Sequence, residues 1–307
     1  MSLELNIQPG PAMPDRRALR DTELDARLRR DGAVVVDAMS EDELDDLRKS
    51  VIALYRGESA GQHYSMLSTD WAYRRSLFDE IPVLIEAMAD RIFDDYDFCV
   101  PSLAFKWPGA KSIIGPHQDM SFVDESRFRS YAIWIPLVAT SLENGALQIL
   151  PGSHLALDNL RVMPGDPPWF KDDLEGIETS DFVALETDPG QVVVWDHAVL
   201  HASGGNFTDE LRPALLAAFK PVEADLLHYH MVDRETADVD VYDGSGEFFK
   251  QLIIGTQPTV EPIARRQFYG TKRSNEEILE LSRRWATSDL ELFRRPIGQA
   301  SERTPVR

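Results

Sequence analysis

The sequence predicts a mainly β protein, a sandwich or jelly roll with flanking helices. Turns such as Glu143-Asn144-Gly145, Pro151-Gly152-Ser153 and Asp188-Pro189-Gly190 separate short apolar segments. Short strands at this spacing, with helical patterns before and after them in the chain, are typical of such folds. The expected strands are residues 98–107, 131–138, 146–150, 182–186, 191–195 and 213–221.

Composition is that of a globular protein, with 43% hydrophobic and 27% charged residues in 307. No linker separates two apolar cores, so we predict a single domain over residues 1–307. The chain has no apolar run long enough to span a bilayer, and its first residues lack the features of a signal peptide. A single cysteine fits a reducing compartment, and we expect a cytoplasmic location.

The net charge is −20, from 52 acidic and 32 basic residues. Such a balance repels phosphate backbones and anionic lipids, so we expect neither nucleic acid nor membrane as a partner. A small-molecule substrate is the expected partner. The sequence gives no indication of the oligomeric state.

The N-terminal elements follow from local signals. Residues 1–20 contain three prolines and no apolar period, which predicts an irregular arm. A short helix over 22–30 ends at Gly32, and a buried strand follows at 33–36. Ser40 and Glu43 form a capping-box pattern for a helix to about residue 56. Another helix is expected over 82–95, with Pro82 at its start.

The C-terminal third is expected to be helical. The jelly-roll core covers about residues 98–222, with a proline-rich loop insertion at 164–173. We expect a helical region over 223–295, which includes a helix opened by Ser274 and Glu277. A last short helix ends before Pro296, and residues 296–307 form a frayed tail.

A candidate metal pair lies in Gly115-Pro116-His117-Gln118-Asp119. On a strand, His117 and Asp119 point to the same side. With one more histidine they would complete the two-histidine, one-carboxylate set that holds non-haem Fe(II). A His-Xaa-Asp triplet alone is common by chance, and the alternative is a surface turn after Pro116.

The segment 191–203 supplies two further histidines. His197 and His201 are four residues apart, so on one strand both would face the same way, and spacing does not choose between them. Arg212 follows His201 by eleven residues at the start of the next strand, and an antiparallel return would bring it alongside. A guanidinium there suits a carboxylate of a chelating dicarboxylate such as 2-oxoglutarate. The alternative is a surface ion pair with Asp209 or Glu210.

Three segments together resemble the phytanoyl-CoA dioxygenase family of Fe(II)- and 2-oxoglutarate-dependent oxygenases. They are His117-Gln118-Asp119, Glu143 to His154 with its Pro-Gly-Ser-His turn, and His201-Ala202-Ser203 with Asn206 and Arg212. The resemblance implies a double-stranded β-helix, with iron held by His117, Asp119 and His201, in preference to His197. It also implies 2-oxoglutarate held by Arg212 and Ser203, with Trp134 near the co-substrate. Lys106, on a strand that leads to the site, is a further co-substrate candidate, and His154 has a structural role in its turn.

The resemblance implies a dioxygenase that uses Fe(II), 2-oxoglutarate and O2, with ascorbate as reductant in vitro. We expect it to hydroxylate an unactivated C–H of an amino acid or secondary metabolite, releasing succinate and CO2. Desaturation, cyclisation and epimerisation stay open, as does a non-catalytic cupin-like binder. The carboxylate of Asp119 argues against halogenation, because related halogenases have a small residue there. The candidate substrate contacts are Gln62, His63, Tyr64, Phe122, Trp169 and Phe170.

Overall fold

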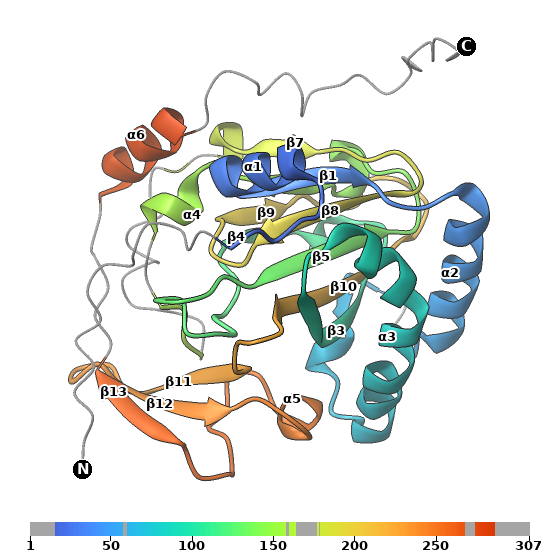
Figure 1. The fold of residues 1–307 in the computed structure, drawn as a ribbon. Helices are drawn as coiled ribbons and strands as arrows, with labels where there is room; N and C mark the ends of the chain where they lie inside the picture. The colour runs from blue at the N-terminus through green and yellow to red at the C-terminus, as the bar shows by residue number, and fades with distance from the viewer. Residues whose placement is uncertain are drawn as a thin grey trace.

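The computed structural model describes residues 16–57, 60–157, 160–163, 177, 179–267 and 274–285. One antiparallel sheet has the order β1-β8-β5-β10-β3-β2, and a second has the order β4-β9-β6-β7 (Figure 1). Side chains of the two sheets pack on each other, so the predicted jelly roll with flanking helices is confirmed. The strands are β1 (Ala33–Asp37), β2 (Gln62–Tyr64), β3 (Tyr96–Lys106), β4 (Ile114–His117), β5 (Tyr131–Pro136), β6 (Leu147–Ile149), β7 (Val183–Leu185), β8 (Gln191–Asp196), β9 (His201–Ser203) and β10 (Arg212–Pro221).

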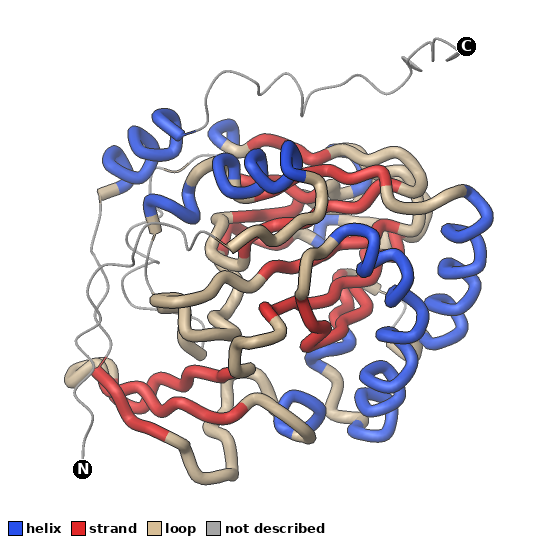
Figure 2. The backbone as a smooth tube through the Cα atoms, in the orientation of Figure 1, coloured by secondary structure: helices blue, strands red, loops and turns tan. Residues whose placement is uncertain are grey.

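The helices begin at residues that satisfy their free N–H groups. α1 (Thr22–Asp31) has Asp21 as N-cap and ends at Gly32, whose φ of 85° is the left-handed conformation that glycine adopts without strain. α2 (Glu41–Leu54) opens with the expected capping box of Ser40 and Glu43. Figure 2 shows α2 and the longer α3 (Trp71–Ile92) along one side of the strands.

The predicted start of α3 was wrong. The helix begins at Trp71, where the side chain of Asp70 accepts from the Tyr73 N–H, and Pro82 lies inside it. The missed signal is the four-residue spacing of Tyr73, Leu77 and Ile81, which continues the buried face on the N-terminal side of Pro82. A proline marks a first helical turn only when no such pattern precedes it.

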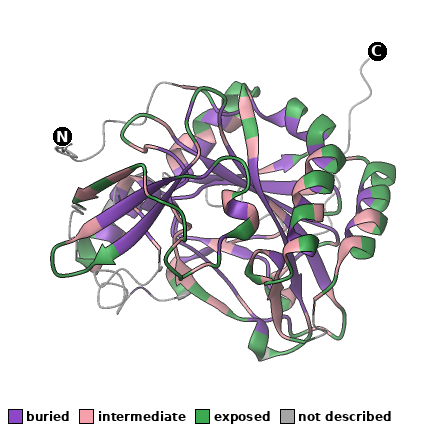
Figure 3. Ribbon diagram, turned by 90° about the horizontal axis from the view of Figure 1, so that it is seen from below, coloured by how far each residue is buried: buried purple, intermediate pink, exposed green. Residues whose placement is uncertain are grey.

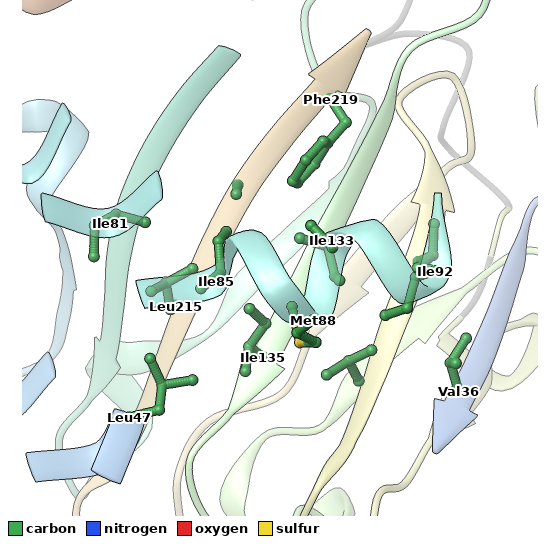
Figure 4. Close-up of a cluster of buried hydrophobic side chains, with 14 of the residues drawn as sticks. Val36, Leu47, Ile81, Ile85, Met88, Ile92, Ile133, Ile135, Leu215 and Phe219 are labelled. Carbon is green, nitrogen blue, oxygen red and sulfur yellow. The ribbon is translucent and has the colours of Figure 1, made fainter. Parts of the chain in front are cut away.

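The outward face of the six-stranded sheet packs under α2 and α3. Figure 4 shows side chains of both helices against β1, β5 and β10, and Figure 3 shows that the strands are buried while the helices expose their outer faces. This apolar layer fixes the sheet on which the inward-facing site residues stand. The labelled contacts are Val36, Leu47, Ile81, Ile85, Met88, Ile92, Ile133, Ile135, Leu215 and Phe219.

Strand register places polar residues together on the inward face. Arg212 of β10 lies opposite Lys106 of β3, which lies opposite Gln62 of β2. Because side chains alternate along a strand, Ala214 and Tyr64 face the same side one step further along. The barrel interior therefore has a cationic end next to small and aromatic side chains.

The helical prediction for 223–295 was wrong for most of its length. A three-stranded antiparallel sheet forms there, from β11 (Leu227–Asp233), β12 (Asp238–Asp243) and β13 (Ala264–Gln267). Apolar residues recur every second position, as at Tyr229 and Met231, and they bury one face of this sheet. Among the described residues of this region, helix is confined to α5 (Phe248–Gln251) and to α6 (Asn275–Trp285), where Ser274 and Glu277 form the expected capping pair.

Several predicted features lie outside the described residues. They are most of the N-terminal arm, the loop at 164–173, the last short helix before Pro296 and the tail at 296–307. The assignment of the whole chain to one domain stays a prediction. Within the part of the chain that the structure describes, no helix has the length and apolar character needed to cross a membrane.

Candidate active site

His117, Asp119 and His201 converge where β4 pairs with β9. β4 pairs with β9 so that His117 lies directly opposite His201. One ligand atom from each of the three residues lies within 4.8 Å of the others, and Oδ1 of Asp119 is 3.8 Å from Nε2 of His201. Such a spread of one oxygen and two nitrogens suits a single divalent ion.

Hydrogen bonds to the backbone orient both imidazoles. Nδ1 of His117 lies 2.9 Å from the Gly115 carbonyl oxygen, and Nδ1 of His201 lies 3.0 Å from that of Val199. A carbonyl only accepts, so each Nδ1 carries the proton and each Nε2 keeps a lone pair for a metal. Burial, with His117 nearby, lowers the pKa of His201 to about 4, which keeps its ring neutral at pH 7.

The second oxygen of Asp119 is already engaged. Nε1 of Trp195 donates to Oδ2 of Asp119 at 3.0 Å, and the indole also lies 5.5 Å from the His201 ring. The sequence reasoning missed this residue, although Trp195 ends the buried strand next to the candidate histidines. Its indole N–H leaves one carboxylate oxygen of Asp119 for a metal.

Arg212 lies in the barrel with its charge unopposed. Its side chain is 3% exposed and lies over Trp134, with 5.2 Å from the guanidinium carbon to the ring centroid. Nε and Nη1 have no acceptor among the described residues, and no ion pair with Asp209 or Glu210 is found there. Burial lowers the pKa of Arg212 to about 10, so the group stays charged at pH 7.

Lys106 is a second buried cation beside Arg212. Its Nζ donates to Ser203 Oγ at 2.6 Å and to the carbonyl oxygens of Ser203 and Gly204. Burial, and to a smaller extent the charge of Arg212, lowers the pKa of Lys106 to about 7.

Gly145 lies against Lys106 and must be glycine, because its φ is +82° and a Cβ would lie 2.7 Å from the Gly204 oxygen and 3.0 Å from Lys106 Cδ.

Asn206 supports the turn between β9 and β10. Its Nδ2 donates to the carbonyl oxygens of Lys106 at 3.0 Å and Glu210 at 2.7 Å, and its own N–H donates to Ser112 Oγ. The side chain is fully buried. Asn206 thus stabilises the turn after which Arg212 pairs with Lys106.

One pocket is lined both by the two candidate histidine ligands and by Arg212. Its lining includes His117, His201, Arg212 and Trp134 together with Tyr64, Ala104 and Leu216. Phe122 lies against the His197 ring and against Phe249 in a neighbouring apolar cluster. Of the six predicted substrate contacts, Tyr64 lines this pocket and Gln62 faces the same side of β2.

His63 was wrongly assigned to the substrate. Strand alternation turns it to the opposite face of β2 from Gln62 and Tyr64, and its ring packs edge-on against Tyr55 at 5.0 Å. Trp169 and Phe170 lie outside the described residues.

The other two candidate histidines have structural contacts. Nδ1 of His197 lies 2.9 Å from Ser130 Oγ, and the ring is buried against Phe122. Nε2 of His154 donates to the Arg29 carbonyl oxygen at 3.0 Å. The metal-ligand group therefore contains His201 and not His197.

These residues fit iron and 2-oxoglutarate. Two neutral imidazoles and one carboxylate are a ligand set suited to Fe(II), and they leave coordination positions for other groups. The orphaned guanidinium N–H groups of Arg212 face the same pocket and suit a carboxylate. The fold and the site together define a jelly-roll protein with a two-histidine, one-carboxylate metal site.

Comparison with known proteins identifies the family of this chain. The family described as phytanoyl-CoA dioxygenase (PhyH) matches residues 28–214. The chain belongs to this family. A phytanoyl-CoA dioxygenase of Arabidopsis thaliana is 29% identical over 162 residues, which are 52% of this chain and 50% of that protein. A phytanoyl-CoA dioxygenase domain-containing protein 1 homolog of Dictyostelium discoideum is 33% identical over 117 residues, 36% of this chain and 40% of that protein.

The chain spans about half the length of the curated relatives that it matches. Among solved structures, the epimerase SnoN in complex with Fe3+, alpha ketoglutarate and nogalamycin RO aligns with a TM-score of 0.48 and 21% identity. That alignment covers 80% of this chain and 96% of the other. Likeness at this level supports no argument about the reaction.

Proposed function

We propose that this protein is an Fe(II)- and 2-oxoglutarate-dependent dioxygenase that hydroxylates an unactivated C–H of a small molecule. One observation carries the proposal: the buried cation Arg212 lines a pocket together with His117 and His201, two of the three convergent candidate ligands. A second buried cation, Lys106, lies beside this pocket and donates to Ser203, which lines it. Neither cation has an acidic partner among the described residues. A buried charge without a partner is costly, and a dicarboxylate that chelates the metal at one end would place its other carboxylate beside Arg212 and Lys106.

The chain's residues then have distinct tasks. His117 and His201 present Nε2 to the metal, and Asp119 presents Oδ1 while Trp195 holds Oδ2. Arg212 binds the far carboxylate of 2-oxoglutarate with two N–H groups, and Lys106 and Ser203 complete that end of the pocket. Iron with bound 2-oxoglutarate supplies the oxidation by O2 that releases succinate and CO2.

The walls of the pocket exclude water and set the position of the substrate. Leu147, Leu216 and Trp134 make its lining largely apolar, which protects a reactive centre from solvent. Tyr64, which lines the pocket, and Gln62 and Phe122 nearby are the proposed substrate contacts. The net charge of −20 favours an amino acid or secondary metabolite over a polyanionic thioester.

Succinate release by the purified chain tests the proposal. With Fe(II), ascorbate and 2-oxoglutarate, even turnover without substrate should form succinate, and Asp119→Ala should abolish it. Absence of both succinate formation and 2-oxoglutarate binding would instead indicate a non-catalytic binder. Incubation with amino acids and small metabolites, followed by mass spectrometry, distinguishes hydroxylation, a gain of one oxygen, from desaturation, cyclisation or epimerisation.

A further inference from the structure

The segment that carries Asp119 makes several hydrogen bonds with the buried guanidinium of Arg161. Nε of Arg161 donates to the backbone carbonyl oxygen of Asp119 at 2.8 Å. Nη1 of the same side chain donates to Glu125 Oε2 at 2.6 Å, and Nη2 donates to Glu125 Oε1. One side chain, 5% exposed, therefore holds residues 119 and 125 at a fixed separation.

Backbone pairing strengthens this arrangement. The N–H of Ser121 donates to the Arg161 carbonyl oxygen at 3.1 Å, and the N–H of Arg161 donates to Ser121 Oγ at 3.1 Å. On its other side, the N–H of Asp119 donates to the His197 carbonyl oxygen at 3.1 Å. Both backbone polar groups of the metal ligand are thus held by separate elements.

The same path continues into the C-terminal sheet. Met163 lies two residues beyond Arg161. Its N–H donates to the carbonyl oxygen of Tyr229 at 2.9 Å, and its carbonyl oxygen accepts from the N–H of Met231 at 2.7 Å. Leu227 of β11 donates to the Phe122 carbonyl oxygen at 2.7 Å. β11 lies beyond residues 28–214, so a hydrogen-bonded path joins the metal ligand to a sheet outside the family match.

We propose that Arg161 is a positioning residue that aims the carboxylate of Asp119 at the metal. The inference rests on the proposed function, since it concerns the same metal. The planar guanidinium makes the three bonds at fixed angles, which an ammonium cannot do. Glu125 neutralises it, so Arg161 acts on Asp119 through geometry and adds no net positive charge beside the metal.

Metal affinity of the full chain is the decisive measurement. Mn(II) binding, followed by the loss of the free-ion electron paramagnetic resonance signal, needs no turnover. Arg161→Met should raise the Kd for Mn(II) by about 10- to 100-fold, the usual effect of losing a group that orients a metal ligand. Arg161→Lys should not restore the affinity. The visible spectrum of bound Co(II) should shift in both variants, because the carboxylate moves.

Arg265→Met is the matched control. Arg265 makes a comparable two-pronged ion pair with the buried Asp240, and it lies on β13, away from the metal ligands. Its loss should leave the Kd for Mn(II) unchanged. If Arg161→Met does not fold, Glu125→Gln provides a second test. Glutamine has the size of glutamate but only one oxygen that accepts, so it cannot accept from Nη1 and Nη2 of Arg161 on separate oxygens. This variant should also raise the Kd for Mn(II).

Two results would overturn the inference. One is a folded Arg161→Met protein whose Kd lies within about twofold of wild type, well below the change expected for an orienting group. The other is an equal rise in Arg265→Met, which would show general destabilisation. Failure of the proposed function looks different: the wild-type chain itself would bind neither Mn(II) nor 2-oxoglutarate.

Discussion

The indole of Trp195 and the carboxylate of Asp119 form a hydrogen bond of 3.0 Å that engages Oδ2. Oδ1 faces Nε2 of His201 at 3.8 Å, so the two oxygens of one side chain have different partners. A carboxylate held in this way presents one oxygen to a metal and does not rotate to offer both. The hydrogen bond therefore reserves a coordination position for another group.

Trp195→Phe should weaken metal binding while the fold is kept. Phenylalanine keeps a ring against His201 but has no N–H, so Oδ2 of Asp119 loses its donor. We expect the Kd for Mn(II) to rise about tenfold, the lower end of the range for such partners. Trp107→Phe is the control, because that indole donates to the Tyr55 hydroxyl away from the metal. Equal affinities in the two variants would contradict the role given to Trp195.

Arg212→Met should separate binding from stability. The variant loses the guanidinium that faces the pocket, and we expect the Kd for 2-oxoglutarate to rise about 100-fold or more. Because the buried charge has no acidic partner among the described residues, its removal should also raise the free energy of unfolding of the ligand-free protein. Calorimetric titration and urea unfolding measure the two effects. A lower stability together with an unchanged Kd would show that Arg212 is structural.

Gly145→Ala should disturb the lysine end of the pocket. The new Cβ would lie 2.7 Å from the Gly204 oxygen and 3.0 Å from Lys106 Cδ, so Lys106 must move. Gly246→Ala is a matched control, since Gly246 also has a positive φ, +62°, but a Cβ there meets nothing within 4 Å. Both variants carry the left-handed backbone cost of about 1–2 kcal/mol. Only Gly145→Ala should weaken 2-oxoglutarate binding; equal effects in both would rule out the close approach as the cause.

The sequence predicted which residues meet at the site, but strand periodicity accounts for only part of the arrangement. β4 ends at His117 and Asp119 lies two residues beyond it, so the approach of Asp119 to His117 depends on the path of that loop. The antiparallel return after His201 brings Arg212 beside Lys106 on the inward face. The choice between His197 and His201 came from the family resemblance and not from spacing. Only the structure shows that His197 contacts Ser130.

What the sequence did not predict depends on long-range contacts. Trp195 and Arg161 reach Asp119 across 76 and 42 residues, and no local pattern marks either pairing. The prediction of helix over 223–295 does not account for the period of two at Tyr229, Met231, Val239 and Val241, which is typical of strands. His63 was misplaced because nothing in a short polar segment indicates which face of β2 is inward.

The pH dependence of co-substrate binding should report Lys106. Its pKa lies near 7 in the ligand-free protein, so the buried side chain loses its proton as the pH rises through that value. Binding of a dicarboxylate favours the charged form. For one proton taken up on binding, the Kd for 2-oxoglutarate should rise roughly 25-fold between pH 6.5 and 8.5.

Lys106→Met should remove most of this pH dependence, with weaker binding at pH 6.5, because Arg212 remains charged throughout the range. The charge of Lys106 favours binding of the co-substrate, but its burial destabilises the folded state. The pKa of Lys106 in the folded state is below its ordinary value of 10.5, so the cost of burying the charge is fully present below about pH 7 and is lost as the pH rises toward 10.5. The wild-type chain should therefore gain stability relative to Lys106→Met over that interval. A Kd that stays constant with pH in the wild-type chain would show that Lys106 keeps one protonation state and does not take up a proton with the co-substrate.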